Sequence, residues 1–326
     1  MKKVLIAPAH LGQRSGPYYD VLSKAGFEMH YHDKPRQLTS EELLARAGGF
    51  PYILAGSEGY PRRILEQLPD LKMIARAGVG YDGVDIAAAT ELGIVVTNTP
   101  GANHEAVAEH CFGMMLYLLK NLADQDRRLR AGEWPRYPTK PLRGKTLGIV
   151  GLGRIGKAMA LRAQVFGLKV LAVEPFPDIA FVKQHAIPLV TMDEMLPTAD
   201  IVTLHVPLTE TTRNFFSSKQ LEQMKPGAIL LNSARGEVLD SFALAKAMEA
   251  GKLSGAGIDV HYQEPLPPDY PLMGFQNVLL TAHTAGVDLQ SRDDMGRIAA
   301  EAIAEVASGG WPTDKVVNPD VLSHRR

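Results

Sequence analysis

The sequence has few of the features that mark secreted, membrane-bound or nucleic-acid-binding proteins. It holds one cysteine in 326 residues, which excludes an intrachain disulfide and a cysteine-rich metal site. Lys and Arg (35) nearly balance Asp and Glu (36), so the net charge of -1 does not favour a nucleic-acid or membrane-surface partner. The longest apolar run, 111–119, is too short to span a bilayer. Pro8 interrupts the apolar N-terminal stretch too early for a secretion signal, so we expect a cytoplasmic protein.

Short apolar runs alternate with helical patterns along the chain, which is typical of parallel β-sheets covered by helices on both faces. Before residue 100, the expected strands are 4–7, 52–55, 73–75 and 94–96. After a proline-broken stretch, they are 146–150, 170–173, 201–204, 228–232, 257–260 and 278–281. We therefore predict an α/β protein with domains near 1–100 and 101–290, followed by a helix over 288–307. Periodicity alone does not assign that last helix to either domain.

One long helix is predicted between the two sets of strands. It begins after Asn103, a plausible N-cap, and fades near 130–132. The apolar residues of its single stripe are Val107, Cys111, Met114, Met115, Leu118 and Leu122.

A dinucleotide-binding pattern opens the second set of strands. The strand 146–150 leads directly into the glycine turn, GLGRIG at 151–156, which helical sequence and another strand follow. Gly151 allows a tight turn, Gly153 lets the backbone approach a pyrophosphate, and Gly156 permits close packing of helix on strand. The N-terminus of the helix offers N–H groups and a partial positive charge to the phosphates.

The acid that closes the next strand indicates which dinucleotide is bound. Glu174 lies 18 residues after Gly156, where a carboxylate can accept hydrogen bonds from the ribose hydroxyls and would repel a 2′-phosphate. No Arg or Lys occupies 175–178 to neutralise such a phosphate. The sequence therefore favours NAD over NADP.

Three residues that follow predicted strands have the side chains that hydride chemistry needs. Arg235, Glu264 and His283 each come after a strand of the second set, at the edge where open α/β sheets bind ligands. A histidine can deliver a proton near neutral pH, and a neighbouring carboxylate favours its charged form and orients its ring. A guanidinium can bind a substrate carboxylate with two hydrogen bonds and polarise a carbonyl. Taken singly, each residue could equally be an ordinary loop or surface residue.

With these motifs assembled, the sequence resembles the D-isomer-specific 2-hydroxyacid dehydrogenases, in particular phosphoglycerate dehydrogenases and glyoxylate/hydroxypyruvate reductases. The resemblance runs from about 71 to 318, most of the chain. The matching segments are ARAGVGYDGVD (75–85), NTPGAN (98–103), AVAE (106–109), the glycine turn, HVPLT (205–209) with Thr212, NSARG (232–236), GIDV (257–260) with Glu264-Pro265, and AHTAG (282–286).

The resemblance implies a role for each matching residue. Arg235 would bind substrate, Glu264 would support the histidine, His283 would be the acid/base, and the amides of Val79 and Gly80 would meet the substrate carboxylate. Asp259 would bind the nicotinamide carboxamide. The full set of implied NAD contacts is Gly151, Gly153, Arg154, Ile155, Gly156, Glu174, His205, Val206, Pro207, Thr212, Ala234, Asp259 and His283.

The resemblance also implies an architecture and partners. A flavodoxin-like substrate domain, 1–100 plus 291–326, would contain an inserted Rossmann cofactor domain, 101–290. The substrate would be a small 2-keto or 2-hydroxy acid, no metal would be needed, and the protein would be a homodimer. Two other functions stay open: an NAD(H)-sensing, corepressor-like binding protein, and a formate or phosphite dehydrogenase of the same family.

Overall fold

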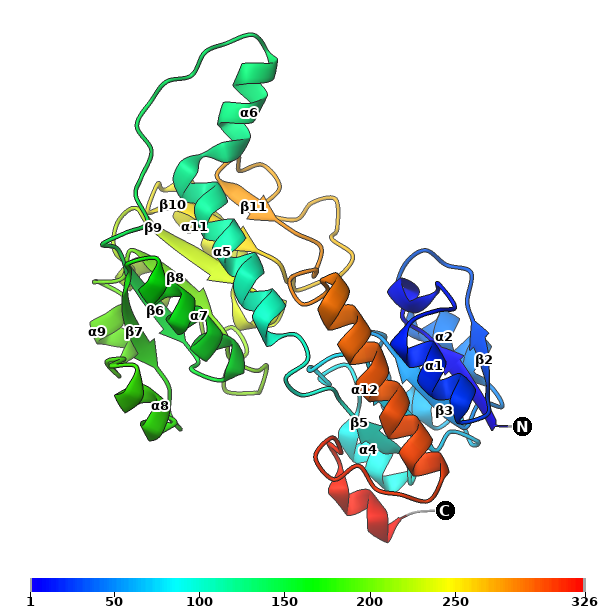
Figure 1. Ribbon diagram of the computed structural model, residues 1–326. Helices are drawn as coiled ribbons and strands as arrows, with labels where there is room; N and C mark the ends of the chain where they lie inside the picture. The colour runs from blue at the N-terminus through cyan, green and yellow to red at the C-terminus, as the bar shows by residue number, and fades with distance from the viewer. Residues whose placement is uncertain (1, 325–326) are drawn as a thin grey trace. The chain divides into compact units, whose positions relative to one another are not determined.

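The computed structural model describes residues 2–324 of the chain (Figure 1). It divides into two compact units: unit 1 comprises 2–103 and 287–324, and unit 2 comprises 104–286. Unit 1 is therefore made from two stretches of the chain, with unit 2 inserted between them. Residues 1, 325 and 326, which the sequence analysis assigned to the first domain, lie outside the described residues.

Unit 1 contains a five-stranded parallel sheet in the order β2-β1-β3-β4-β5, the doubly wound order of flavodoxin-like folds. Its strands are β1 (Lys2–Ile6), β2 (Phe27–Tyr31), β3 (Tyr52–Ala55), β4 (Met73–Arg76) and β5 (Val95–Thr97). Its helices are η1 (Ala9–Leu11), α1 (Pro17–Lys24), α2 (Ser40–Ala47), α3 (Arg62–Leu65), α4 (Ile86–Glu91), α12 (Leu289–Ala307) and η3 (Pro319–Ser323).

Both faces of this sheet are covered by apolar layers, because successive side chains of a strand point to opposite faces. Leu5 of β1 packs in the layer that contains residues of α2, α3 and α4. Its neighbours Val4 and Ile6 pack in the layer that contains α1 and α12, which lie side by side (Figure 1). The strands expected from the sequence are continuously apolar because each contributes side chains to the apolar layers on both faces of the sheet.

One buried side chain ties the C-terminal stretch to β5. The Oδ1 atom of Asn318 accepts a hydrogen bond from the N–H of Val96 at 2.8 Å. Its Nδ2 atom donates to the carbonyl of Ile94 at 2.9 Å and to Oγ1 of Thr90 at 3.1 Å. The N–H of Val317 also donates to the Val96 carbonyl, at 2.8 Å. With the packing of α12, these bonds place the last stretch in unit 1.

Unit 2 contains a six-stranded parallel sheet in the order β11-β10-β9-β8-β6-β7. Its strands are β6 (Thr146–Val150), β7 (Lys169–Val173), β8 (Ile201–Leu204), β9 (Ala228–Asn232), β10 (Leu253–Ile258) and β11 (Val278–Leu280). Its helices are α5 (His104–Lys120), α6 (Leu122–Arg130), α7 (Arg154–Val165), α8 (Ile179–Gln184), α9 (Met192–Met195), α10 (Ser218–Gln223), η2 (Gly236–Val238) and α11 (Ser241–Glu249).

The order of these strands places the glycine turn at the ligand-binding edge of unit 2. The first strand, β6, lies between β7 and β8, so the winding of the chain reverses there. Ligands of open α/β sheets bind at such a switch point, outside the carboxyl ends of the strands. The glycine turn follows β6 directly. The predicted class, α/β with two doubly wound parallel-sheet domains, is confirmed.

Most predicted strands agree with the structure to within two residues at each end, and two strands differ by more. Strand β2 was not predicted, because it is an edge strand whose residues after Phe27 are only partly buried, so it lacks a continuous apolar run. Strand β10 begins at Leu253 and not at 257, because Ser254 and two glycines interrupt its apolar pattern. One of them, Gly257, has no room for a side chain: a Cβ there would lie 2.9 Å from Sδ of Met114.

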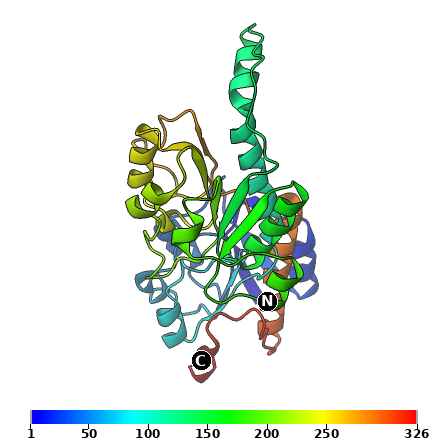
Figure 2. The ribbon, with the colours of Figure 1, turned by 90° about the vertical axis from the view of Figure 1, so that its left-hand side faces the viewer.

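The prediction of a single long helix between the two sets of strands was wrong. Asn121 adopts a left-handed backbone (φ 52°) that ends α5 and begins α6, and no residue of α6 is buried. Leu122, assigned to the buried stripe, is 48% exposed. In two views α6 extends away from the rest of unit 2 (Figure 1; Figure 2). Apolar residues recur at helical spacing past Asn121, but those of α6 are not buried.

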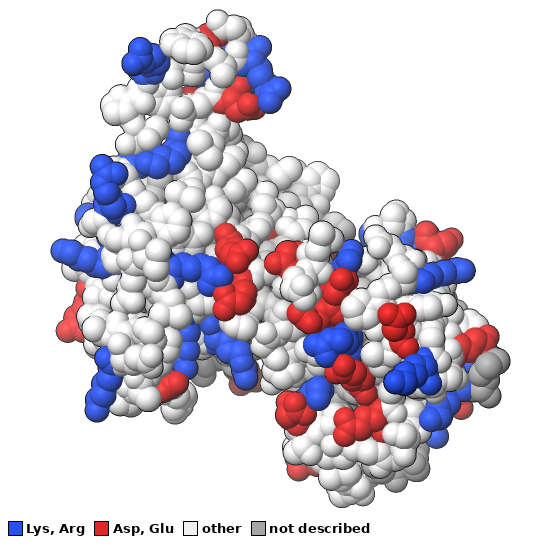
Figure 3. Space-filling model, viewed as in Figure 1, with Lys and Arg blue, Asp and Glu red and all other residues white. Residues whose placement is uncertain are grey.

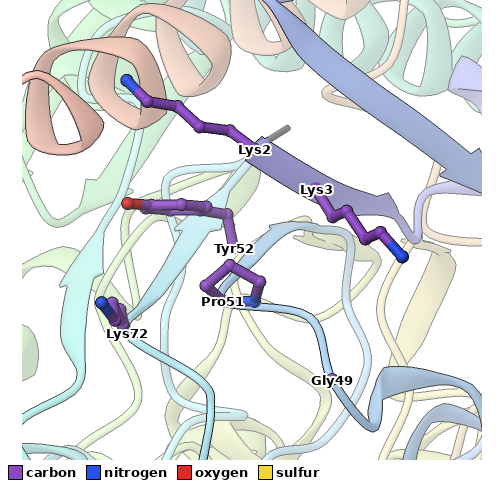
Figure 4. A pocket seen from close by; sticks show the side chains of 6 residues that line it. All are labelled: Lys2, Lys3, Gly49, Pro51, Tyr52 and Lys72. Carbon is purple, nitrogen blue, oxygen red and sulfur yellow. The ribbon is translucent and has the colours of Figure 1, made fainter.

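Few other features of residues 2–324 suggest a binding site apart from the carboxyl edge of the sheet in unit 2. Both signs of charge are mixed on the face shown in Figure 3. The hollow in Figure 4 lies where β1, β3 and β4 begin, away from their carboxyl ends, and the ammonium groups of Lys2 and Lys3 extend in opposite directions. Residues 2–324 contain no helix long and apolar enough to cross a membrane and no group of three His, Cys, Asp or Glu that could hold a metal.

Candidate active site

Glycine is required at two positions of the glycine turn. Gly151 has φ +95°, and a Cβ there would lie 2.6 Å from the carbonyl oxygen of His205. A Cβ on Gly156 would lie 2.1 Å from the carbonyl oxygen of Gly151, so a side chain would push α7 off β6. A Cβ on Gly153 would meet no protein atom within 4 Å. The turn is therefore closed towards the sheet and open where a ligand would approach.

Helix α7 begins at this turn without a side-chain cap. Gly153 is the N-cap residue and supplies no acceptor, so the first N–H groups of the helix lack a side-chain partner. Arg154 is exposed and Ile155 partly buried in the first turn. These features fit the pyrophosphate of a dinucleotide, because free N–H groups and the helix dipole both favour an anion.

Glu174 is tied to the glycine turn through its carboxylate. Oε2 accepts a hydrogen bond from the N–H of Leu152 at 2.8 Å, and Oε1 accepts one from the N–H of Phe176 at 2.9 Å. A nearby cation of α7, Lys157, is paired with Asp178 at 2.7 Å. The acid is thus held beside the phosphate-binding turn, as the choice of NAD over NADP requires.

The segment after β8 borders the same turn through the carbonyl of His205. Burial lowers the pKa of His205 to about 3, so its ring is neutral at physiological pH, and its Nε2 lies 2.9 Å from Oγ1 of Thr203. Val206 and Pro207 follow, and Oγ1 of Thr212 donates to the carbonyl of Pro207 at 2.6 Å. A neutral, partly buried His205 borders the turn and is not suited to proton transfer.

Arg235 follows β9 in a turn that one buried amide holds. The Oδ1 atom of Asn232 accepts from the N–H of Ala234 at 3.0 Å, and its Nδ2 donates to the carbonyl of Arg235 at 2.9 Å. The guanidinium is partly exposed, and its Nη1 donates to the carbonyl of Ala234 at 2.6 Å. This role of Asn232 was not predicted, because a polar residue at a strand end is too common to indicate one.

Glu264 and His283 form the hydrogen-bonded pair that the sequence predicts. Nδ1 of His283 lies 2.8 Å from Oε2 of Glu264, and the two side chains are 37% and 33% exposed. Burial acts to raise the pKa of Glu264, but the hydrogen bond and charge of His283 and the N–H of His261 outweigh it, so the pKa is lowered. Glu264 is therefore a carboxylate at neutral pH and can orient the imidazole.

The loop that carries His283 is anchored to Asp259, which is 1% exposed. Oδ1 of Asp259 accepts from Oγ1 of Thr281 at 2.5 Å and from the N–H of Thr284 at 2.9 Å, and Oδ2 accepts from the N–H of Ala285 at 3.0 Å. The N–H of His283 donates to the Asp259 carbonyl at 2.8 Å. These bonds hold His283 in a left-handed backbone conformation (φ 54°) that non-glycine residues rarely adopt. The implied contact of Asp259 with the nicotinamide stays a prediction.

The implied carboxylate-binding amides belong to unit 1, in the segment after β4. The carbonyl of Val79 accepts a hydrogen bond from Nδ2 of Asn98 at 2.7 Å, and that of Gly80 accepts one from Nε of Arg76 at 3.1 Å. Within residues 2–324, the amides of Val79 and Gly80 donate to no protein acceptor. The segment is therefore held by its carbonyls while its N–H groups are unused.

Residues 112–285 match the family model of the D-isomer specific 2-hydroxyacid dehydrogenase, NAD binding domain. The chain belongs to this family. The matched residues contain the glycine turn, Glu174, Arg235, Glu264 and His283. Membership confirms the predicted family, NAD as cofactor, and the class of D-2-hydroxyacid dehydrogenase acting on CH–OH. The roles of the individual site residues stay predictions.

Relatives within the family differ in name and length. A glyoxylate reductase from Korarchaeum cryptofilum is 40% identical over 268 residues, 80% of each chain. A D-3-phosphoglycerate dehydrogenase from Archaeoglobus fulgidus is 37% identical over 302 residues, which are 92% of this chain and 56% of that protein. The chain thus spans little more than half of the latter. A solved D-lactate dehydrogenase from Aquifex aeolicus, complexed with NAD and lactic acid, is 26% identical with a TM-score of 0.86, and the match covers 97% of this chain and 99% of that one.

Proposed function

We propose that the protein reduces a small 2-keto acid to its D-2-hydroxy acid with NADH, and catalyses the reverse oxidation with NAD. The observation that carries this is the 2.8 Å pair of His283 and Glu264 in the unit that also holds the glycine turn. The candidate substrates are glyoxylate, hydroxypyruvate and the keto acid that corresponds to 3-phosphoglycerate, because relatives of similar identity are named glyoxylate reductase (40%) and D-3-phosphoglycerate dehydrogenase (37%).

The side chains divide the chemistry as follows. The group that NADH supplies when bound is a hydride for the keto carbon. His283 gives a proton to the keto oxygen from Nε2, because Nδ1 is engaged by Glu264. Arg235 binds the substrate carboxylate with two parallel hydrogen bonds and polarises the carbonyl, and the amides of Val79 and Gly80 bind the same carboxylate. In the oxidation, His283 accepts the proton.

The cofactor would be held by segments that lie after successive strands of unit 2. The glycine turn and the start of α7 would bind the pyrophosphate, and Glu174 the adenosine ribose. The remaining contacts would come from the loops after β8, β9 and β10. The residues assigned to them are His205, Val206, Pro207, Thr212, Ala234 and Asp259.

A substrate panel tests the proposal. We expect NADH oxidation with glyoxylate or hydroxypyruvate, followed at 340 nm, and a loss of turnover of about a hundredfold to ten-thousandfold in His283→Ala. NADH affinity, measured by fluorescence titration, should hardly change, since the glycine turn is intact. Near-normal turnover of His283→Ala would refute the role of the histidine.

The same panel separates the two alternative functions. Tight NADH binding without turnover on any keto acid would favour an NAD(H) sensor. Reduction of NAD by formate or phosphite would favour a dehydrogenase of that type. The carboxylate-paired His283 favours neither a sensor nor a formate dehydrogenase, because a sensor needs no proton donor and formate has no hydroxyl proton to lose.

The preference for NAD has its own test at Glu174. Glu174→Ala should lower the ratio of kcat/KM with NADH to kcat/KM with NADPH by about tenfold or more, because no carboxylate then repels the 2′-phosphate of NADPH. The ratio of kcat/KM values with the two cofactors measures this. An unchanged ratio would remove Glu174 from cofactor selection.

We also propose that the protein is a cytoplasmic homodimer. Helix α6 buries none of its residues, and Leu122, Leu129 and Trp134 are 48%, 52% and 77% exposed, which suits a surface that a second copy covers. A single buried thiol, Cys111, suits a reducing compartment. Sedimentation should give a dimer, and Leu129→Glu should shift it to the monomer. A monomeric wild type would contradict the proposal.

A further inference from the structure

His261 is a buried histidine directly behind the predicted catalytic pair. It lies between Asp259 and Glu264 and is 5% exposed. Its Nε2 is 2.8 Å from the carbonyl oxygen of Thr281, and its Nδ1 is 3.1 Å from the hydroxyl of Tyr270. The rings of His261 and Tyr270 pack edge to face, with centroids 5.2 Å apart. Both ring nitrogens therefore have protein partners.

This one residue contacts the supports of all three predicted catalytic side chains. Its N–H donates to Oε1 of Glu264 at 3.0 Å. Its carbonyl group lies against Gly236, the residue after Arg235, where a Cβ would come within 2.1 Å of the carbonyl oxygen. Its ring holds Thr281, two residues before His283. The geometry of the three side chains thus depends on the place of His261.

The partners of the ring fix its hydrogen-bonding state. A carbonyl oxygen can only accept, so Nε2 carries the hydrogen that Thr281 receives. In the neutral ring, Nδ1 is then the acceptor, and the hydroxyl of Tyr270 donates to it. Thr281 is also held by its N–H, which donates to the Ile258 carbonyl at 3.0 Å. Every backbone polar group of Thr281 is thereby engaged.

We propose that His261 is a positioning residue for proton transfer, because its Nε2–H bond to the Thr281 carbonyl holds the loop that presents His283 to Glu264. The inference rests on the proposed function. Loss of this donor leaves a carbonyl in the loop without its partner, which destabilises the observed conformation. Since His283 has a left-handed backbone, a loosened loop will relax towards commoner conformations and carry the imidazole away from Oε2 of Glu264.

Two variants separate a positioning role from simple core packing. His261→Phe keeps the ring against Tyr270 but has no donor for Thr281, and we expect kcat for keto-acid reduction to fall roughly tenfold to a hundredfold. KM for NADH should stay within error. His261→Gln places an N–H₂ group near the former Nε2, and we expect it to recover most of the lost kcat.

The pH profile gives a readout that packing alone does not move. His283 must carry a proton in the reduction, so the pH dependence of kcat/KM reports on the environment of its imidazole. The pH profile of His261→Phe should differ from that of the wild type, and His261→Gln should restore the wild-type profile. The other titratable groups around this loop are Asp259, Tyr270 and His110, whose Nε2 lies 3.1 Å from Oγ1 of Thr281, and all variants retain them.

Controls keep this result apart from the proposed function. His185→Phe alters a partly buried histidine that packs on Phe181 elsewhere in unit 2, and it should behave as wild type. If His283→Ala is inactive while His261→Phe keeps the wild-type kcat and pH profile, the positioning role is overturned and the proposed function stands. If His283→Ala stays active, the proposed function itself fails.

The comparison remains decisive if His261→Phe does not fold. His261→Asn carries its donor at the level of Nδ1 and cannot reach the Thr281 carbonyl, so it should show the low kcat and the shifted profile, while His261→Gln does not. Equal kcat values and equal profiles in the two amide variants would overturn the inference.

Discussion

Replacement of Asp259 by Asn tests how firmly the histidine loop is held. The carboxylate accepts three hydrogen bonds from this loop, two at Oδ1 and one at Oδ2. An asparagine that keeps its oxygen at Oδ1 retains two of them, but each weakens by roughly 1 kcal/mol because the acceptor is no longer charged. Its N–H₂ group then faces the N–H of Ala285, which loses its buried acceptor at about 1–3 kcal/mol. We expect unfolding of unit 2 to become easier by about 3–5 kcal/mol.

Urea unfolding followed by circular dichroism measures this loss. Asp193→Asn is a matched control, because Asp193 is an exposed acid of the same unit and its replacement should stay within about 0.5 kcal/mol of wild type. Asp259→Asn should also lose turnover, because the loop that it loosens carries His283. A stability of Asp259→Asn equal to that of the control would show that these three bonds contribute little and that other contacts hold the loop.

Two further predictions concern single side chains. The pKa of Glu264 is lowered in the folded protein from its usual value of 4.5. The ionised carboxylate therefore stabilises the fold at a pH above 4.5, and this stabilisation is lost as the pH falls through the pKa of the folded state. The stability gap between wild type and Glu264→Gln should therefore be constant near pH 7 and shrink below pH 4.5, and a gap independent of pH would contradict this. Asn318→Ala leaves the N–H of Val96 and the carbonyl of Ile94 without partners, so unit 1 should lose about 2–4 kcal/mol in urea unfolding, whereas a loss below about 0.5 kcal/mol would mean that the C-terminal stretch is held by α12 alone.

The parts of the fold that the sequence predicted are those set by local constraints. The strands 146–150, 201–204 and 228–232 were placed with the bounds that the structure shows, because each is a continuous run buried on both faces. The glycine turn was equally readable, since Gly151 and Gly156 are dictated by a positive φ and by a close helix-to-strand contact. The types of side chain that follow the strands singled out Arg235 and His283 as candidates without knowledge of their neighbours, and their roles stay predictions.

The parts that were missed depend on contacts distant in the sequence or on the loss of contacts. Strand β2 is stabilised mainly by pairing with β1, which its mixed residues do not reveal. The break at Asn121 leaves α6 without a buried face, although the apolar spacing continues. His261 reads as an ordinary loop residue, because its importance arises from Tyr270 and Thr281, nine and twenty residues further along.

The split of unit 1 into two stretches has a consequence for synthesis of the chain. A ribosome produces residues 1–103, then all of unit 2, and only afterwards α12, which packs with α1 over the face of the first sheet that includes Val4 and Ile6. At about 5–20 residues per second, that face waits roughly 10–40 s for its cover. Unit 2 can fold during this interval from a single stretch of chain. Unit 2 can therefore be complete before unit 1, whose sheet receives its last covering helix only after unit 2 has been made.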